Sequence, residues 1–180
     1  MLYTNLLTKL HSQRKQPHPS PVTSEEFCIV GLDPGETTGA CVFDGTSLVK
    51  AEQLKTKSMP EAAIIVQEFL NSQMPDLIVM EEYRVYAWKA SSHSGSSVHT
   101  LRLIGAIQYI AHIMNIPIVF QSAGEGKGFC TDEKLKDWGF YQVAKRHAND
   151  AIRHVTHYQL FGKEDKHGNQ SVSQNTNPSR

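Results

Sequence analysis

The sequence predicts an α/β protein with a mixed five-stranded sheet and helices on both faces. Two observations predict this class. Three strand-like segments follow one another between residues 27 and 54, and helical and strand-like segments then alternate as far as residue 161. The resulting order, βββαβαβα, needs helices that cross from strand to strand and so cover both sides of the sheet.

The first three strands are predicted from short apolar runs separated by turn signals. Residues 27–32 form a continuous apolar run, which is typical of a buried strand, and Asp33-Pro34-Gly35 ends it. Residues 39–43 are expected to return as the second strand. Asp44-Gly45 is a strong hairpin signal, so residues 47–54 are expected to be the third strand of a meander.

A helix is predicted after this meander, followed by a fourth strand. Ser58 is expected to cap the helix, with Pro60 in its first turn and Glu61 completing a capping box. Residues 76–80 are a second buried run, and they end at Glu81-Glu82. The apolar residues between cap and strand follow helical spacing: Ala62, Ile65, Val66, Phe69 and Leu70.

The remaining segments alternate between helix and strand. Residues 98–114 are predicted to be helical, because their apolar residues recur at helical spacing. Residues 116–120 are expected to be the fifth strand, and residues 121–132 a glycine-rich loop. The last helix is expected to span residues 134–161, interrupted at Gly139.

The folded domain is expected at residues 26–162, with a tail at each end. Residues 1–25 are interpreted as a flexible tail, because prolines at 17, 19 and 21 prevent the helical turns before them from continuing. Residues 163–180 are polar and predicted to be disordered. The chain of 180 residues is long enough for one domain with a core of its own.

The composition argues against several classes of protein. The sequence has no apolar run long enough for a transmembrane helix and no secretory signal pattern. The three cysteines, Cys28, Cys41 and Cys130, lie far apart, which argues against a disulfide framework and a cysteine-based zinc site. We therefore expect no membrane partner and a cytoplasmic location, in a bacterium or an infected host cell. The acid-free opening leaves a mitochondrial transit peptide as an alternative.

Charge is unevenly distributed along a chain whose net charge is +0. Residues 25–82 hold eleven acidic and three basic residues, a net of −8, whereas residues 83–162 hold five acidic and nine basic residues, a net of +4. An acidic segment can hold cations and a basic segment can hold phosphates. Ordinary surface variation is the alternative explanation.

Four side chains are candidates for a metal site. Asp33 follows the first strand and Glu81 follows the fourth, while His147 and Asp150 lie three residues apart on one face of the last helix. If the two strands are neighbours and the helix crosses them, the four side chains meet. Such a set suits Mg²⁺ or Mn²⁺, and two ions about 4 Å apart can promote phosphodiester hydrolysis.

The acidic residue at the end of the fourth strand leaves a choice open. Adjacent strand residues point to opposite faces, so only one of Glu81 and Glu82 can enter the site. Glu81 is favoured because it follows its apolar run immediately, as Asp33 does. His154 and His157 are expected on the surface of the last helix.

These residues resemble motifs of the RuvC-type Holliday junction resolvases, which belong to the ribonuclease-H-like superfamily. The matching segments lie within residues 27–161, in the family's order, and Gly105 falls where the family tends to have a glycine. The form HANDAIRH and the two tails look most like phage-encoded members. The segments are Ile29-Val30-Gly31-Leu32-Asp33-Pro34-Gly35 with Thr38-Gly39, Leu77-Ile78-Val79-Met80-Glu81, and His147-Ala148-Asn149-Asp150-Ala151.

The resemblance implies a ribonuclease-H-like fold and an endonuclease that resolves four-way DNA junctions by paired nicks. Asp33, Glu81, His147 and Asp150 would be the ligands of two Mg²⁺ ions, for which Mn²⁺ would be able to substitute. Asp33 would bridge the ions, and His147 would bind or orient a metal or help to activate water. The nick would leave a 5′-phosphate and a 3′-hydroxyl, and symmetric nicks imply a homodimer.

Basic residues around this site are candidates for DNA binding. Lys127 and Lys134 are expected near the phosphates at the cut, and phosphate contacts would give affinity with little sequence information. The family often has an aromatic residue three positions after its second acidic residue, where this chain has Arg84. The other candidates for the phosphate-binding rim are Arg84, Lys89, Arg102, Lys145, Arg146 and Arg153.

Two other functions remain open from the sequence. The first is a nuclease of the same fold that cuts other branched DNA, flaps or RNA–DNA hybrids. The second is a non-catalytic junction-binding scaffold, against which the intact carboxylate set argues.

Overall fold

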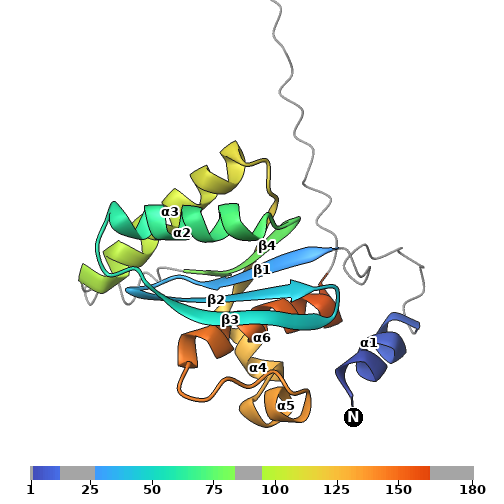
Figure 1. Ribbon diagram of the computed structural model, residues 1–180. Helices are drawn as coiled ribbons and strands as arrows, with labels where there is room; N and C mark the ends of the chain where they lie inside the picture. Colours follow the sequence, from blue (N-terminus) through green and yellow to red (C-terminus); the bar gives the residue numbers. More distant parts are fainter. Residues whose placement is uncertain (1, 13–26, 84–94, 163–180) are drawn as a thin grey trace, which may run out of the picture.

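A computed structural model of the chain describes residues 2–12, 27–83 and 95–162. Its centre is a mixed five-stranded sheet with the strand order β3-β2-β1-β4-β5 (Figure 1). Strands β3, β2 and β1 pair antiparallel, whereas β1, β4 and β5 run parallel. The predicted fold class is confirmed. The strands are β1 (Cys28–Asp33), β2 (Thr37–Asp44), β3 (Ser47–Lys55), β4 (Leu77–Glu82) and β5 (Ile118–Ser122).

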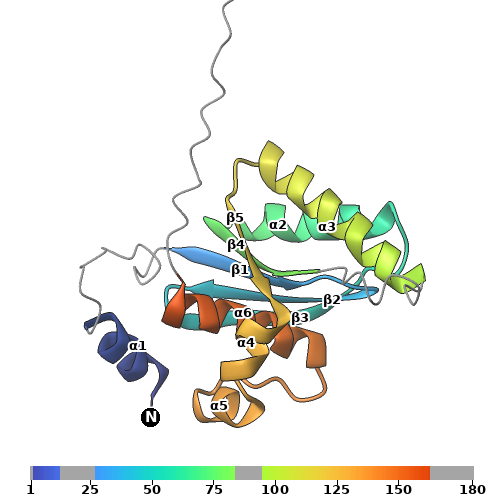
Figure 2. The same cartoon turned by 180° about the vertical axis from the view of Figure 1, so that it is seen from behind.

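Helices cover both faces of this sheet, as Figures 1 and 2 show from opposite sides. Helices α2 (Glu61–Gln73) and α3 (Gly95–Ile113) lie on one face. Helices α4 (Ala123–Phe129), α5 (Asp132–Asp137) and α6 (Arg146–Phe161) lie on the other, where α6 packs across β2, β1 and β4. Each face therefore has its own buried apolar cluster.

The alternation of strand residues decides which side chains face α6. In β1, Ile29 belongs to the cluster beneath α6 and Val30 to the cluster beneath α2 and α3. In β4, Val79 belongs to the cluster beneath α6 and Met80 to the cluster beneath α2 and α3. Because side chains alternate along a strand, Asp33 faces α6, and so does Glu81 in β4.

Two glycines allow α6 to lie directly on the sheet. A Cβ atom at Gly39 of β2 would be 1.9 Å from the carbonyl oxygen of His147. A Cβ atom at Gly31 of β1 would be 2.8 Å from the carbonyl oxygen of Ala151. Neither position has room for a side chain, so these glycines set the distance between α6 and the strands that carry the acidic residues.

The predicted loop at residues 121–132 is wrong for most of its length. β5 continues to Ser122 and helix α4 follows, although α4 contains three glycines. The Glu125 carboxylate accepts hydrogen bonds from the backbone N–H (2.5 Å) and the hydroxyl (2.8 Å) of Ser122. This local cap stabilises a first turn that helix propensity alone disfavours.

The helical segment predicted for residues 134–161 is interrupted at Gly139 as expected, but the interruption is longer than predicted. α5 ends at Asp137, and α6 begins only at Arg146. Gly139, with φ at +78°, turns the chain after α5, and Phe140 packs into the core. The Asn149 side chain then exchanges two 2.8 Å hydrogen bonds with the backbone of Gln142. The intervening segment is thus held against α6 rather than continuing a helix.

The beginning of α2 also differs in detail from its predicted capping box. Pro60 is the N-cap residue. The Ser58 hydroxyl donates to the Glu61 carboxylate at 3.1 Å instead of accepting from the helix backbone.

Residues 3–12 differ from the flexible tail expected for residues 1–25. They form helix α1 (Tyr3–Ser12), in which Tyr3 and Leu7 are buried. The Tyr3 ring packs against Trp138 at 5.0 Å, and its hydroxyl donates to Gln159 of α6 at 2.7 Å. The physical reason is that Tyr3, Leu6, Leu7 and Leu10 form one apolar face, which tertiary contacts stabilise.

The rest of the predicted tails, residue 1 and residues 13–25 and 163–180, lies outside the described residues. Within the described residues, the structure contains no helix that is both long enough and apolar enough to cross a membrane.

Candidate metal centre

The predicted acidic residues meet where the carboxyl ends of β1 and β4 lie beneath α6. Leu32 pairs with Met80, so Asp33 and Glu81 follow at the same edge of the sheet. Asp33, His147 and Asp150 each offer a ligand atom within 4.8 Å of the other two. The His147 imidazole Nδ1 is 3.0 Å from Asp33 Oδ2. The structure thus brings together three of the four predicted ligands in one cluster.

Glu81 lies beside this cluster and is connected to it through Lys127. The Lys127 Nζ atom is 3.3 Å from Glu81 Oε2 and 3.5 Å from Asp150 Oδ2. Glu82 points to the other face, where it lines a small pocket with Tyr83. Of the two adjacent glutamates, Glu81 is therefore the one that faces the cluster.

The acidic residues differ in how their surroundings affect their protonation. Burial raises the pKa of Asp33 to about 6, with further upward effects from Glu81 and Asp150 and an opposing hydrogen bond from His147. Burial alone would also raise the pKa of Glu81. The hydrogen bond from His154 and the positive charge of Lys127 outweigh burial and lower that pKa to about 2. The charge of Asp33 is therefore less well compensated than that of Glu81.

Lys127 is surrounded by the carboxylates. Burial opposes its charge, but Glu81, Asp150 and Asp33 together raise the pKa of its amine. The sequence suggested Lys127 as a phosphate contact. In the structure it lies among the predicted metal ligands.

Asp150 is held in place by Arg153. The Arg153 guanidinium pairs with both Asp150 and Asp132, and its Nε donates to the Cys130 carbonyl at 2.8 Å. Its side chain is only 12% exposed. Arg153 therefore joins α6 to α5, and its hydrogen bonds are used inside the protein rather than on a phosphate-binding rim.

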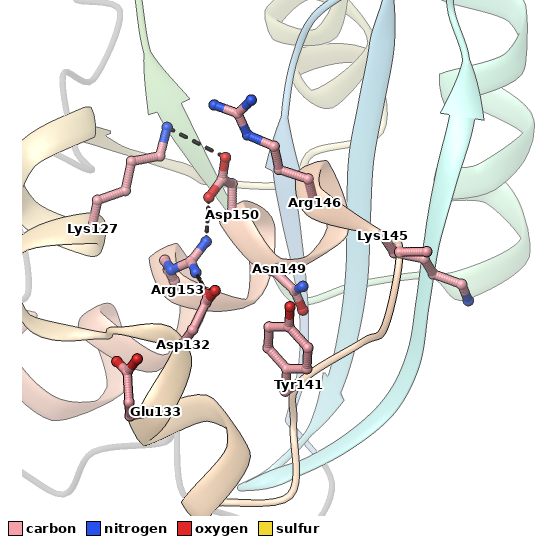
Figure 3. Close-up of a pocket in the computed structure, with 10 residues that line it drawn as sticks. Lys127, Asp132, Glu133, Tyr141, Lys145, Arg146, Asn149, Asp150 and Arg153 are labelled. Carbon is pink, nitrogen blue, oxygen red and sulfur yellow. Dashed lines mark hydrogen bonds and ion pairs between the residues drawn. The ribbon is translucent and has the colours of Figure 1, made fainter.

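An open pocket of about 600 Å³ adjoins Asp150 (Figure 3). Lys127, Lys145 and Arg146 contribute to its lining. Figure 3 shows Arg146 and Lys127 extending near Asp150, whereas Lys145 points away. The Lys145 amine donates instead to the Ala51 carbonyl at 2.9 Å.

The other predicted DNA-binding residues are not gathered at this pocket. The Lys134 amine donates to the Phe129 carbonyl at 2.7 Å and lies over the Phe129 ring. Arg102 is exposed on α3, which covers the opposite face of the sheet (Figures 1 and 2). Arg84 and Lys89 lie outside the described residues.

His154 is the site residue that sequence reasoning missed. Its predicted surface position is wrong, because its exposure is 0% and its Nε2 lies 3.1 Å from Glu81 Oε2. Helical spacing contained the signal. His154 lies four residues after Asp150 and seven after His147, which places all three on one face of α6.

The donor set fits a hard divalent cation. Carboxylate oxygens with one imidazole are ligands that Mg²⁺ and Mn²⁺ accept. Thiolates are absent from this cluster of described residues. Carboxylates gathered in a partly buried site repel one another unless a cation is present.

Comparisons with known proteins place this geometry in a known fold. No family model and no curated protein matches the sequence. The structure resembles Thermus thermophilus RuvC in complex with a Holliday junction substrate, with a TM-score of 0.58, 17% identity, and coverage of 75% of this chain and 94% of that chain. This chain has a RuvC-like resolvase fold.

The structure also resembles two resolvases from other sources. The yeast mitochondrial Holliday junction resolvase Ydc2 matches with a TM-score of 0.53, 13% identity, and coverage of 88% of this chain and 92% of that chain. The fowlpox virus resolvase, in complex with substrate Holliday junction DNA, matches with a TM-score of 0.53, 13% identity, and coverage of 74% and 97%. The fold predicted from the resemblance is confirmed.

Proposed function

We propose that this protein is a divalent-metal-dependent endonuclease that cuts branched DNA, with the four-way junction as its substrate. The observation that carries this proposal is the cluster of Asp33, His147 and Asp150, beside Glu81, at the carboxyl ends of neighbouring strands. It lies in a fold shared with a RuvC structure in complex with a Holliday junction substrate and with a structure described as a Holliday junction resolvase.

In this proposal the chain's own residues hold and shape the reaction site. Asp33, Glu81, His147 and Asp150 would hold two Mg²⁺ ions, for which Mn²⁺ can substitute. When bound, the ions would activate a water molecule and stabilise the leaving oxygen of the phosphodiester. Lys127 would turn from the carboxylates, once cations compensate their charge, toward the phosphate being cut.

Recognition of DNA would begin at the pocket beside Asp150. Arg146 extends there, and contacts with phosphates would fix the DNA backbone without reading its sequence. The shape of a branched substrate, rather than its bases, would then decide which DNA is bound.

The test of this proposal is cleavage of a labelled synthetic four-way junction with and without Mg²⁺. Linear duplex, flap and RNA–DNA hybrid substrates are the controls. We expect paired symmetric nicks on the junction in the presence of Mg²⁺. Cleavage of many branched forms would extend the substrate to branched DNA in general. Tight junction binding without any cleavage would contradict the enzyme and favour a scaffold.

Divalent metal is expected to stabilise the protein against heat. At a metal concentration about 100 times its Kd, binding to the folded state adds about 2.7 kcal/mol. For a chain of this size, that corresponds to a rise in Tm of roughly 5–10 °C. Differential scanning fluorimetry with MgCl₂ or MnCl₂ measures it, with NaCl of matched ionic strength as control. An unchanged Tm at saturating metal would contradict the metal centre.

This stabilisation is expected to shrink as the pH falls from 8 to 5. The pKa of Asp33 is raised to about 6 in the folded protein, so below that pH a proton competes with the metal. Protonation of Asp33 itself favours the folded, metal-free state, because its folded pKa exceeds its unfolded value. The same melting experiment at several pH values tests this. A metal-dependent shift in Tm that stays constant across the range would contradict the role of Asp33.

A homodimer fits this function, and α3 offers a surface for a second copy. Exposed apolar residues recur along one face of this helix, and Phe120 of the neighbouring edge strand adds to them. Symmetric nicks need two sites related by a two-fold axis, and a two-fold interface uses the same face of both copies. The apolar residues of α3 are Val98, Leu101, Tyr109 and Ile113.

Tyr109→Glu is therefore expected to convert a dimer into a monomer. A charge at a side chain that is 66% exposed should leave the fold intact but disfavour an apolar interface. Light scattering coupled to gel filtration should show the mass fall toward the 20.1 kDa of one chain. Val49→Glu, on the distant edge strand β3, is the matched control. A Tyr109→Glu protein that remained dimeric would exclude this face.

A further inference from the structure

A fully buried histidine links the metal centre to the sheet. His154 of α6 has an exposure of 0%. Its Nε2 lies 3.1 Å from Glu81 Oε2, and its Nδ1 lies 3.1 Å from the Gln121 side chain. Glu81 and Gln121 are directly paired residues of β4 and β5. One imidazole thus contacts both strands from the helix above them.

The surroundings leave this imidazole little freedom to move. Gln121 is itself only 5% exposed. Helix α4 also lies against the ring, since a Cβ atom at Gly126 would be 3.0 Å from His154 Nδ1. The ring is therefore enclosed by α4, α6 and the two strands.

The hydrogen bond to Glu81 has a definite direction. An ionised carboxylate only accepts hydrogen bonds, so His154 Nε2 donates to Glu81. The Gln121 atom that faces Nδ1 is the carboxamide oxygen, which accepts a hydrogen bond from an Nδ1–H; a half-turn of the carboxamide would instead present its NH₂ to an unprotonated Nδ1. In either arrangement Gln121 holds the imidazole so that Nε2 faces Glu81.

A purely structural role would not call for this arrangement. The core beneath α6 is otherwise formed mainly by apolar side chains, which fill such space without polar partners. The carboxylate that His154 contacts is 20% exposed and faces the metal centre. Lys127 competes for the same Glu81 oxygen from 3.3 Å. A second, fixed donor keeps Glu81 in place when the lysine leaves.

We propose that His154 and Gln121 are positioning residues that hold the Glu81 carboxylate for the divalent cation. The inference rests on the proposed metal centre and deepens it. Neither residue binds the metal or touches the substrate. Their effect is to fix the orientation of a ligand, and loss of such supporting hydrogen bonds typically weakens metal binding by about 10–100-fold.

The test measures Mn²⁺ binding to the full-length protein without DNA, by calorimetry and by electron paramagnetic resonance. His154→Leu is expected to weaken binding by about 10–100-fold. His154→Gln should restore most of it, because its side-chain NH₂ can donate to Glu81 from a similar position. Gln121→Leu, which removes the partner of Nδ1, should weaken binding by a smaller factor than His154→Leu.

His157→Leu is the matched control. His157 is a half-buried histidine on the same helix, and no hydrogen bond to its Nδ1 is found among the described residues. Its replacement should leave the Mn²⁺ affinity unchanged. Tm values of all variants are compared in the absence of metal. If His154→Leu fails to fold, Gln121→Leu and His154→Gln decide the matter.

The outcomes separate this inference from the proposed function. Unchanged Mn²⁺ affinity in folded His154→Leu or Gln121→Leu, with a wild-type protein that still cuts junctions, overturns the positioning role alone. Weakened binding that His154→Gln restores supports the role, even if the wild-type protein cuts no junction. Failure of His154→Gln to restore affinity would overturn the hydrogen-bond explanation. A wild-type protein that binds no Mn²⁺ overturns both proposals.

Discussion

Asp33→Asn is expected to abolish junction cleavage while leaving junction binding intact. The Asp33 carboxylate lies between the sheet and α6, where His147 contacts it. Its side chain is mostly buried. An amide of the same shape retains the packing but loses the charge that holds a cation. Metal ions contribute several kcal/mol to such reactions, and each ~1.4 kcal/mol is tenfold in rate. We therefore expect a loss of at least about 10³-fold.

Asp44→Asn provides the matched control for this experiment. Asp44 is exposed at the far end of β2, opposite Cys28 at the beginning of β1. The same chemical change there should alter neither cleavage nor binding. Rates are measured with labelled junction at saturating Mg²⁺, and binding is measured in EDTA by gel shift. A fully active Asp33→Asn protein would exclude Asp33 as a metal ligand and remove the basis of the proposed site.

Gly39→Ala is expected to have the largest effect on stability of any methyl addition in the sheet. The new Cβ atom would lie 1.9 Å from the His147 carbonyl oxygen and 2.2 Å from its carbonyl carbon. These are backbone atoms at the beginning of α6, so they cannot rotate away as a flexible side chain can. Overpacking of this kind costs about 3 kcal/mol or more where backbone must shift. Urea unfolding of the metal-free protein measures this cost directly.

The same substitution should also impair the metal centre, because α6 carries His147 and Asp150. The Mn²⁺ affinity of Gly39→Ala is expected to fall even under conditions in which the protein is folded. Gly128→Ala is the control, since a Cβ atom there meets nothing within 4 Å and the residue is in helix α4. Alanine in a helix is favoured over glycine by about 1 kcal/mol. Equal stability of the two variants would show that α6 does not contact β2 at Gly39.

These two experiments test different parts of one arrangement. Asp33→Asn changes the charge of the centre and keeps its geometry. Gly39→Ala keeps every ligand and changes the distance between the helix and the sheet. We expect both changes to reduce Mn²⁺ binding but only Gly39→Ala to lower the free energy of unfolding. That result would show that metal binding at this site can be lost without loss of stability.

The candidate ligands could be predicted from the sequence because each depends on a local pattern. Asp33 and Glu81 each end an apolar run, and the parallel pairing of β1 with β4 brings such run ends to one edge. His147 and Asp150 share a helix face by spacing alone. The sheet and its main helices are predictable for the same reason, since hydrophobic periodicity is set residue by residue.

The elements that the sequence did not reveal depend on contacts between distant segments. Helix α4 contains three glycines, and α1 is short, so neither has strong local helix propensity. Each packs against α6 in the folded chain. The sequence predicted the break between α5 and α6 at Gly139 but not its length, which depends on the Asn149 side chain that holds the backbone of Gln142.

The sequence by itself determined the class of fold, the order of the strands along the chain and the residues that could bind a metal. Only the tertiary structure decided which neighbours those residues have. In the folded chain His154 is buried against Glu81, Lys127 lies among the carboxylates, and Arg153 forms an ion pair with Asp150. The physical reason is that alternation and helical spacing specify the face on which a side chain lies. Its hydrogen bonds and its burial depend on the segments that pack against that face.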